Sequence, residues 1–383
     1  MRAPCRIGTA VRRLFPLSTD RLYLNTGGLG PASQPVLNAM QEQNVKAATI
    51  GEHYHSRLKA VHGTAARVFG VDEDEVAFVR NASEGNSVIA AGMRLESGDE
   101  VIFDSHAHPG GFSPWMNRQK LDGVKVRVFE PSSESPEANL DRIFSLVNER
   151  TRVIQVSHIT ATTGLLFDIA AIAAQARKRG IWFHVDGAQS AGMIPLDLRV
   201  LQCDSYATSG HKWLNGFIET GLLYIARERI DAIDCSHLGS YSSEEYDVPD
   251  SFVYVPTVQR HEYGTHNAAP VMGLGVAFEF QERIGRERIA AHGKQLAKET
   301  QARIEILDGI EILTPQRDDM RGSILTFRFP GRDSRAIYTA LWKRGVRSRI
   351  VTEEGLNAVR VSWHVYHQIG DVESFVQGLK SVI

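Results

Sequence analysis

Short apolar segments alternate with helical ones along the first two thirds of the chain, and this order limits the folds that are open to it. Helical periodicity covers residues 34–69, an Ala/Ile-rich helix is expected over 168–179, and a small-residue helix follows the turn at 81–86. Segments of strand length occur at 76–79, 100–104, 124–130, 152–159, 181–186, 205–208 and 221–226. Strands that alternate with helices form βαβ units, so the sequence predicts an α/β fold with a mostly parallel sheet covered by helices on both faces.

The pattern changes after about residue 256, where two long helical stretches are followed by a mixture of strands and helices. The expected helices cover 268–284, 286–306 and 333–344 and a last one begins at Asp371, while strands are expected at 324–329, 346–351 and 357–363. This order predicts a smaller α+β domain. We therefore expect an N-terminal arm over 1–20 that packs with the small domain, a large domain over 21–255 and a small C-terminal domain over 256–383.

Composition excludes several classes of function. The chain of 383 residues is 43% hydrophobic and 23% charged with a net charge of −2, so neither nucleic acid nor a membrane surface is an expected partner. Its three cysteines, Cys5, Cys203 and Cys235, show no paired spacing, which indicates neither a disulfide framework nor a metal site. The basic N-terminus lacks the apolar run of a signal peptide, and no stretch approaches the roughly 18 apolar residues of a membrane span. We expect a cytoplasmic protein.

Two charged residues at the ends of neighbouring predicted strands indicate a ligand site. Asp186 ends the strand at 181–186, and Lys212 follows the strand at 205–208 together with Ser209 and His211. Ligands of open α/β sheets bind at the carboxyl ends of the strands. A lone Asp at this position is often a helix cap and a lone Lys is usually solvated, but their joint occurrence with Asp186-Gly-Ala-Gln189 favours a site.

These residue types suit pyridoxal phosphate (PLP). A carboxylate keeps the pyridine nitrogen of PLP protonated, and a lysine amine forms a Schiff base with its aldehyde. Its phosphate needs hydroxyl groups and the backbone N–H groups of a helix N-terminus. Asp186, Lys212 and Ser209 supply the side chains, and the turn at 81–86 supplies the helix start.

Residues 184–213 resemble class V aminotransferases and cysteine desulfurases of PLP fold type I. The segment 157–164 is more similar to the isopenicillin N epimerase-like and C–S lyase-like branches. The resemblance extends from Tyr23-Leu-Asn25 to Arg360-Val-Ser362. It implies that Lys212 forms the Schiff base, Asp186 pairs with the pyridine nitrogen and Gln189 contacts the ring hydroxyl. It further implies that the phosphate is held by Ser209, His211 and the turn of Ala82, Ser83 and Glu84.

The same resemblance assigns further residues. His108, in a His-Pro-Gly-Gly-Phe-Ser-Pro-Trp segment, would stack on the cofactor ring and act in catalysis, although His106 lies nearby. Arg360 would bind the α-carboxylate of an amino-acid substrate, beside Asn25 and Gly27. Thr265 would reach the phosphate of a partner subunit, which implies a homodimer with active sites shared across the interface. The alternatives are polar loop residues and, for the loop of Thr265, a cap of the next helix.

Two departures from the desulfurases narrow the expected reaction. Their nucleophilic cysteine lies shortly before the substrate arginine, but residues 345–360 contain no cysteine. Thr160 also lies where they carry an asparagine near the ring hydroxyl, and its own hydroxyl is expected to contact the cofactor.

The preferred expectation is β-elimination by a C–S lyase on an S-substituted cysteine, with Lys212 as the base for the α-proton. An amino-acid epimerase and an aminotransferase remain alternatives. A non-catalytic regulatory scaffold with the same fold is an alternative of another class.

Overall fold

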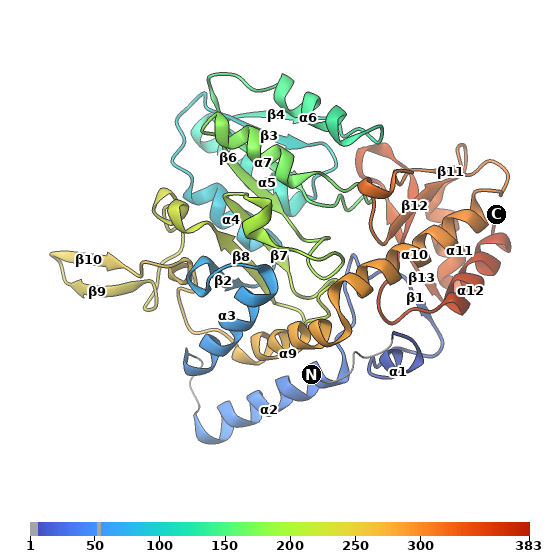
Figure 1. Cartoon of the computed structure of the whole chain (residues 1–383), viewed down its shortest axis with the longest axis horizontal. Helices are drawn as coiled ribbons and strands as arrows, with labels where there is room; N and C mark the ends of the chain where they lie inside the picture. Colours follow the sequence, from blue (N-terminus) through green and yellow to red (C-terminus); the bar gives the residue numbers. More distant parts are fainter. Residues whose placement is uncertain (1–6, 52–54) are drawn as a thin grey trace.

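A seven-stranded sheet organises the larger part of the chain in this computed structural model, which describes residues 7–51 and 55–383 (Figure 1). The strand order is β2-β8-β7-β6-β5-β3-β4, and only β8 runs antiparallel to its neighbours. The mostly parallel sheet predicted from the sequence is therefore confirmed. The strands are β2 (Val76–Val79), β3 (Glu100–Asp104), β4 (Lys125–Phe129), β5 (Thr151–Ser157), β6 (Trp182–Asp186), β7 (Ser205–Ser209) and β8 (Gly221–Ile225).

Helices cover both faces of this sheet because alternate residues of its strands are buried on opposite sides. Ile154 and Val156 of β5 belong to a core with α3 (His55–Phe69), α7 (Ile169–Lys178) and α9 (Ala268–Ile284). Val153 belongs to the core on the other face, with α4 (Ala82–Gly92) and α5 (Pro109–Asp122).

Several elements differ from the sequence-based expectation. The helical pattern over 34–69 is two helices, α2 (Gln34–Ile50) and α3, because Gly51 ends α2 with a φ of 60°. The segment around Pro136 begins a helix, α6 (Pro136–Ser145), which Ser135 caps by accepting a hydrogen bond from the Ala138 N–H. A hairpin of β9 (Ser243–Asp247) and β10 (Ser251–Tyr254) projects from the body of the molecule (Figure 1).

The smaller unit is a four-stranded antiparallel sheet packed against helices, with the order β11-β12-β15-β14. Its core contains Leu296, Phe327, Leu341, Val361 and Phe375. The elements are α10 (Arg286–Ile304), β11 (Glu311–Ile312), β12 (Ile324–Arg328), α11 (Ser334–Lys343), β14 (Arg349–Val351), β15 (Ala358–Ser362) and α12 (Ile369–Lys380). The single strand expected at 346–351 is divided, because β13 (Val346–Arg347) pairs with β1 (Leu22–Tyr23) instead.

Most of α9 packs on the large unit, although Phe280 and Ile284 near its end pack with Phe15 and Tyr366. Val271, Leu274 and Phe278 of α9 belong to the core of the large sheet. The N-terminal segment, with α1 (Thr9–Arg12), packs beside the small unit, where Phe15 contacts the ring of Tyr366. The domain boundary expected at residue 256 remains a prediction.

The remaining regular elements are short. They are the helix α8 (Leu198–Leu201) and the 3-10 helices η1 (Glu73–Glu75), η2 (Arg227–Ala232), η3 (Val258–His261), η4 (Asp318–Met320) and η5 (Glu353–Gly355). Within residues 7–51 and 55–383, no helix combines the length and the apolar character that a bilayer crossing requires.

Candidate active site

A cavity of about 280 Å³ lies at the carboxyl edge of the large sheet. It brings together side chains that follow different strands, because the carboxyl ends of parallel strands meet at one edge. Its lining residues are Gly27, Gly28, Asn81, Ala82, Ser83, His108, Ala161, Asp186, Ala188, Gln189, Ser209, His211, Lys212, Arg349 and Arg360.

Asp186 is the last residue of β6, and its side chain is held on both oxygens. Its Oδ2 accepts a hydrogen bond from Asn86 Nδ2 at 2.8 Å, and its Oδ1 accepts one from the Ala188 N–H at 3.0 Å. Only 7% of Asp186 is exposed. A buried carboxylate that accepts two hydrogen bonds is fixed in orientation.

Lys212 follows β7, and its amine faces the same cavity. Burial lowers the pKa of Lys212 to about 8, and Asp186 opposes this shift through its negative charge. Arg360 and Arg349 lower the pKa further, because their positive charges repel the ammonium form. A lysine with a pKa near 8 has a large fraction of neutral amine at physiological pH, which is the form that acts as a nucleophile or a base.

His108 lines the cavity and is the N-cap of α5. Its Nδ1 accepts a hydrogen bond from the Gly110 N–H at 3.0 Å. Burial of the ring lowers the pKa of His108, and the positive charge of Lys212 lowers it further. The imidazole is therefore neutral at physiological pH, a form suited to contact with an aromatic ring.

The start of α4 provides backbone N–H groups on another side of the cavity. The Ala82 N–H donates to Ser209 Oγ at 3.0 Å, and Asn81 caps the helix through the Glu84 N–H. His211 adds a buried Nδ1 that has no hydrogen-bond partner, and burial lowers its pKa to about 4. A helix N-terminus with a hydroxyl and an unpaired imidazole nitrogen suits an anionic group.

Arg360 and Gln189 approach the cavity from opposite units. Gln189 donates to Gly27 O and accepts from Trp213 Nε1, each at 2.8 Å. Arg360 donates to Ala161 O at 2.7 Å and to Asn25 Oδ1 at 3.1 Å. Its Nε is buried without a partner, and burial lowers the pKa of Arg360 to about 9. A buried guanidinium bonded only to neutral oxygens is prepared to bind an anion.

The chain matches a known protein family over most of its length. Residues 22–375 match the aminotransferase class-V family. The chain belongs to this family.

Two relatives of this class-V enzyme are named for two different reactions. A probable cysteine desulfurase of Methanothermobacter thermautotrophicus is 32% identical over 309 residues, covering 79% of this chain and 76% of the relative. An isopenicillin N epimerase of Amycolatopsis lactamdurans is 27% identical over 377 residues, 94% of each chain. A solved complex of the cystine C–S lyase C-DES with cysteine persulfide superposes with a TM-score of 0.88 at 22% identity, covering 96% of this chain and 99% of that one. These findings confirm fold type I and PLP as the cofactor.

The residues of the cavity fit PLP. The cofactor supplies an aldehyde, a basic ring nitrogen and a phosphate, and the cavity offers an amine, a carboxylate and a helix N-terminus. The Nδ1 of His211 has no hydrogen-bond partner in the protein, so it is free to form a hydrogen bond with the cofactor. Gly111 leaves room beside the carboxylate, because a Cβ at this position would lie 3.1 Å from Asp186 Oδ2.

Four residues assigned from the sequence lie away from the cavity wall, and their assigned roles remain predictions. Thr160 is buried, and its hydroxyl accepts from the Leu165 N–H within a turn. Glu84 forms an ion pair with Arg80, and Asn25 accepts a hydrogen bond from Arg360. Thr265 is exposed on the loop before α9.

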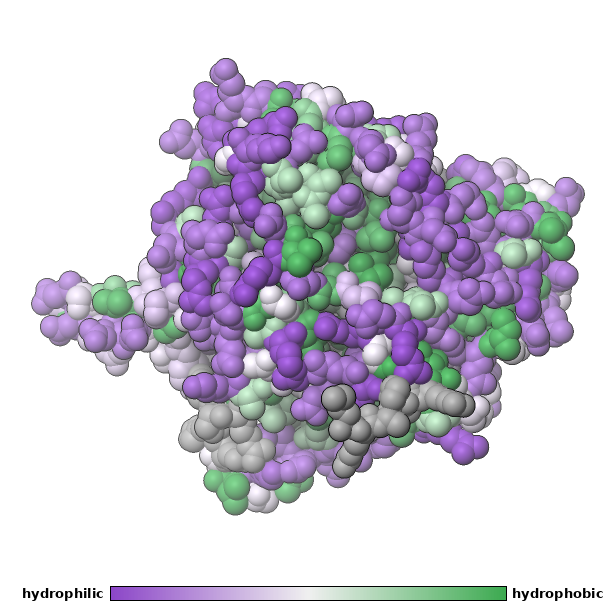
Figure 2. Space-filling view, viewed as in Figure 1, coloured by the Kyte–Doolittle hydropathy of each residue, from purple (hydrophilic) through white to green (hydrophobic). Residues whose placement is uncertain are grey.

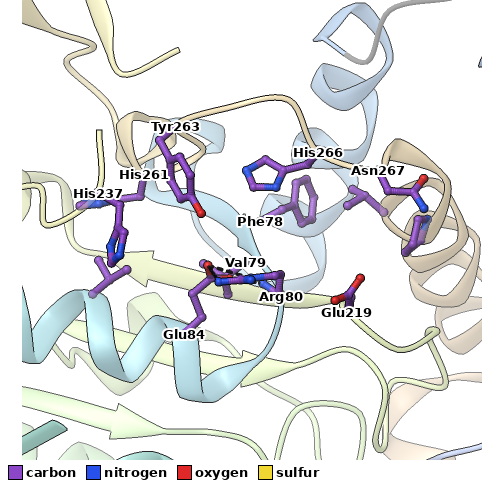
Figure 3. A pocket seen from close by; sticks show the side chains of 13 residues that line it. Phe78, Val79, Arg80, Glu84, Glu219, His237, His261, Tyr263, His266 and Asn267 are labelled. Atoms are coloured by element: carbon purple, nitrogen blue, oxygen red, sulfur yellow. Dashed lines mark hydrogen bonds and ion pairs between the residues drawn. The ribbon is translucent and has the colours of Figure 1, made fainter. Parts of the chain in front are cut away.

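The loop of Thr265 borders a second pocket next to the start of α4. Figure 3 shows Tyr263 and His266 from this loop above the Arg80–Glu84 pair. Glu84 therefore faces this neighbouring pocket, while Ala82 and Ser83 face the candidate site. The two pockets share the first turn of α4 as a wall.

Sequence reasoning missed Arg349 and Asn86. Arg349 lies directly opposite Arg360 in the pairing of β14 with β15, and its Nη1 is buried without a partner. The only sequence feature that indicated a role for Arg349 was its position in the segment just before Arg360. Asn86 lies at the end of the turn assigned to the phosphate, but it contacts Asp186 instead.

The lowered pKa of Lys212 predicts a pH profile for cofactor attachment. In the cofactor-free protein, the rate of covalent attachment of added PLP should rise roughly tenfold per pH unit below about 8 and level off above it, because only the neutral amine reacts. Asp186→Asn should move the profile to lower pH, because it removes a charge that favours the ammonium form. Borohydride reduction followed by peptide mass spectrometry measures the adduct.

Lys178→Ala is the matched control, because Lys178 is exposed at the end of α7. It should retain the adduct, and Lys212→Ala should lose it. An adduct on another lysine, or a profile with a midpoint near that of a free lysine, would contradict the assignment.

Proposed function

We propose that this class-V enzyme cleaves S-substituted cysteines by β-elimination. In the balanced reaction, the substrate R–S–CH2–CH(NH3⁺)–COO⁻ and one water give R–SH, pyruvate and ammonium. The Cα–H and Cβ–S bonds break, the sulfur leaves with the electron pair of the C–S bond, and water releases the nitrogen as ammonium.

The observation that carries this proposal is the set of groups in the cavity. Within residues 7–51 and 55–383, no cysteine lines it, although Lys212 and Asp186 both do. Cys203 is buried in the core of the large unit, and burial raises the pKa of its thiol well above the usual range. The thiolate needed to accept sulfur from a free cysteine is therefore missing from the wall, so cleavage by elimination is favoured.

Each group has a role in this reaction. Bound PLP serves as an electron sink for the carbanion at Cα. The Lys212 amine takes the α-proton, because a pKa of about 8 lets it act as a base. The Asp186 carboxylate would hold the proton on the pyridine nitrogen of bound PLP, and the neutral His108 ring would contact the cofactor. Arg360 binds the α-carboxylate with its unpaired N–H.

Arg349 supports a substrate with a second anionic group. Its Cα pairs with that of Arg360 on the adjacent strand, so both side chains point to the same face of the sheet. Arg349 forms an ion pair with Glu353, which offsets part of its repulsion from Arg360, but its Nη1 remains buried without a partner. One carboxylate on the amino acid and another on the sulfur substituent satisfy both arginines. The C-DES relative is named as a cystine C–S lyase, and cystine carries two carboxylates.

A product assay tests the reaction. The purified PLP-bound enzyme should release pyruvate, ammonium and a thiol in equal amounts from an S-substituted cysteine, and Lys212→Ala should reduce the rate by at least about 1,000-fold. Lactate dehydrogenase coupling measures pyruvate, and Ellman's reagent measures the thiol.

Other outcomes of the assay distinguish the alternatives. Solvent deuterium at Cα with inverted configuration would identify an epimerase, and amino transfer that depends on a keto acid would identify an aminotransferase. No product from any amino acid would favour a non-catalytic scaffold. Any of these three outcomes, if no pyruvate is released, would refute the proposed β-elimination.

Two substrates that differ in the charge of the sulfur substituent test whether Arg349 binds that substituent. Arg349→Met should raise the KM for S-carboxymethylcysteine by about 10- to 100-fold, because a charged hydrogen bond is lost, and should change the KM for S-methylcysteine much less. Arg347→Met is the matched control, because Arg347 packs against Trp342 away from the cavity. Equal increases for the two substrates would show that Arg349 does not bind the sulfur substituent.

We also propose that the enzyme is a homodimer. Large apolar side chains are exposed on the projecting hairpin, including Tyr246 and Phe252, and on the loop of Phe217 and Ile218. In Figure 2 polar residues predominate on the visible face, and hydrophobic residues also appear on the hairpin. Exposed apolar groups of this size favour burial against another subunit. Light scattering should give the mass of two chains, and a single-chain mass at micromolar concentration would exclude the dimer.

A further inference from the structure

A hydrogen-bond chain runs behind Asp186, away from the cavity. Trp182 Nε1 lies 2.9 Å from Ser205 Oγ, which lies 2.8 Å from His184 Nδ1. His184 Nε2 lies 2.9 Å from Asn86 Oδ1, and Asn86 Nδ2 lies 2.8 Å from Asp186 Oδ2. Each of these residues is at most 7% exposed. The chain thus connects the interior of the sheet to the carboxylate.

The two ends of the chain determine the direction of every bond in it. The indole N–H of Trp182 can only donate, and an ionised carboxylate can only accept. A second hydrogen bond fixes which atom of the Asn86 amide is the nitrogen, because Nδ2 also donates to Gly110 O at 3.2 Å. Its Oδ1 must therefore accept from His184, and the Ser205 hydroxyl, which accepts from Trp182, is free to donate to His184.

This direction requires one protonation state of His184. Its Nε2 carries a proton, and its Nδ1 carries none and accepts. The chain would be interrupted by a proton on Nδ1, because the Ser205 hydroxyl would no longer have an acceptor there. Burial lowers the pKa of His184 to about 4, so the ring is neutral at physiological pH and has the single proton that the chain needs.

We propose that Asn86 and His184 are positioning residues, and that the hydrogen bonds from Trp182 through Ser205 hold the Asp186 carboxylate in the orientation that would meet the ring nitrogen of PLP. This inference rests on the proposed role of Asp186. Each bond in the chain donates toward the carboxylate, and bonds in such a series polarise one another. A carboxylate fixed before the cofactor binds needs no reorganisation when it meets the positive ring.

The first test uses the protein without cofactor. In protein labelled with ¹⁵N-histidine, and with His184 assigned by comparison with His184→Gln, the ring proton of His184 should be on Nε2. A proton on Nδ1 would reverse the chain and overturn the proposal, whatever reaction the enzyme catalyses.

The second test measures the dissociation constant of PLP. Asn86→Ala should raise it by about 10- to 100-fold, and Ser205→Ala by about 2- to 10-fold, as expected for a hydrogen bond to a charged and to a neutral group respectively. Thr300→Val is the matched control, because it removes an equally buried hydroxyl that bonds only within α10, and it should have no effect.

A double variant separates positioning from general structural damage. If Ser205 acts through Asn86, then Ser205→Ala should have little further effect on PLP binding in the Asn86→Ala background. If the dissociation constant of PLP in the double variant rises by the product of the two single increases, the proposal is overturned. If Asn86→Ala does not fold, as judged by thermal unfolding of the cofactor-free protein, His184→Gln replaces it in the cycle.

Asp186→Asn distinguishes failure of this inference from failure of the proposed function. Normal PLP binding by Asp186→Asn would remove Asp186 from its role, and with it the premise of the proposed function. Weak binding by Asp186→Asn together with normal binding by Asn86→Ala would refute only the positioning chain.

Discussion

The attraction between Asp186 and Lys212 across one cavity is the interaction on which the candidate site depends. The two residues follow β6 and β7, which are adjacent parallel strands. Asp186 stabilises the charged form of Lys212, while burial and two arginines stabilise the neutral amine. Because these effects oppose each other, the amine is close to the balance between its two forms at physiological pH, as a group that exchanges protons requires.

Both units of the molecule build this cavity. The large unit contributes Asp186, Lys212 and the start of α4, and the strands of the small unit contribute Arg349 and Arg360. Arg360 also connects the units directly, since it donates to the Ala161 carbonyl of the large unit. The Arg360 side of the cavity therefore depends on the relative position of the two units, whereas Asp186 and Lys212 follow adjacent strands of one sheet.

Proteins with this fold carry the names of different reactions. A desulfurase, an epimerase and a C–S lyase are all similar to this chain over most of its length. Proton removal by a lysine beside a cofactor is compatible with each of these activities. Among the described residues, 7–51 and 55–383, the lining of this cavity includes Arg349 and no cysteine, and the proposed elimination rests on these two features.

The sequence by itself determined the sheet, the cofactor and the pair Asp186 and Lys212, because strand periodicity and a short motif are local properties of the chain. Only the tertiary structure showed that α9 packs on the large unit, since an apolar helix face does not specify which core it joins. The tertiary structure also showed that Asn86 donates a hydrogen bond to Asp186 and that Arg349 pairs with Arg360 across two strands. It showed that the Thr160 hydroxyl accepts a hydrogen bond within its own turn. These contacts depend on strand register and on side-chain direction across long separations in sequence, which no local pattern encodes.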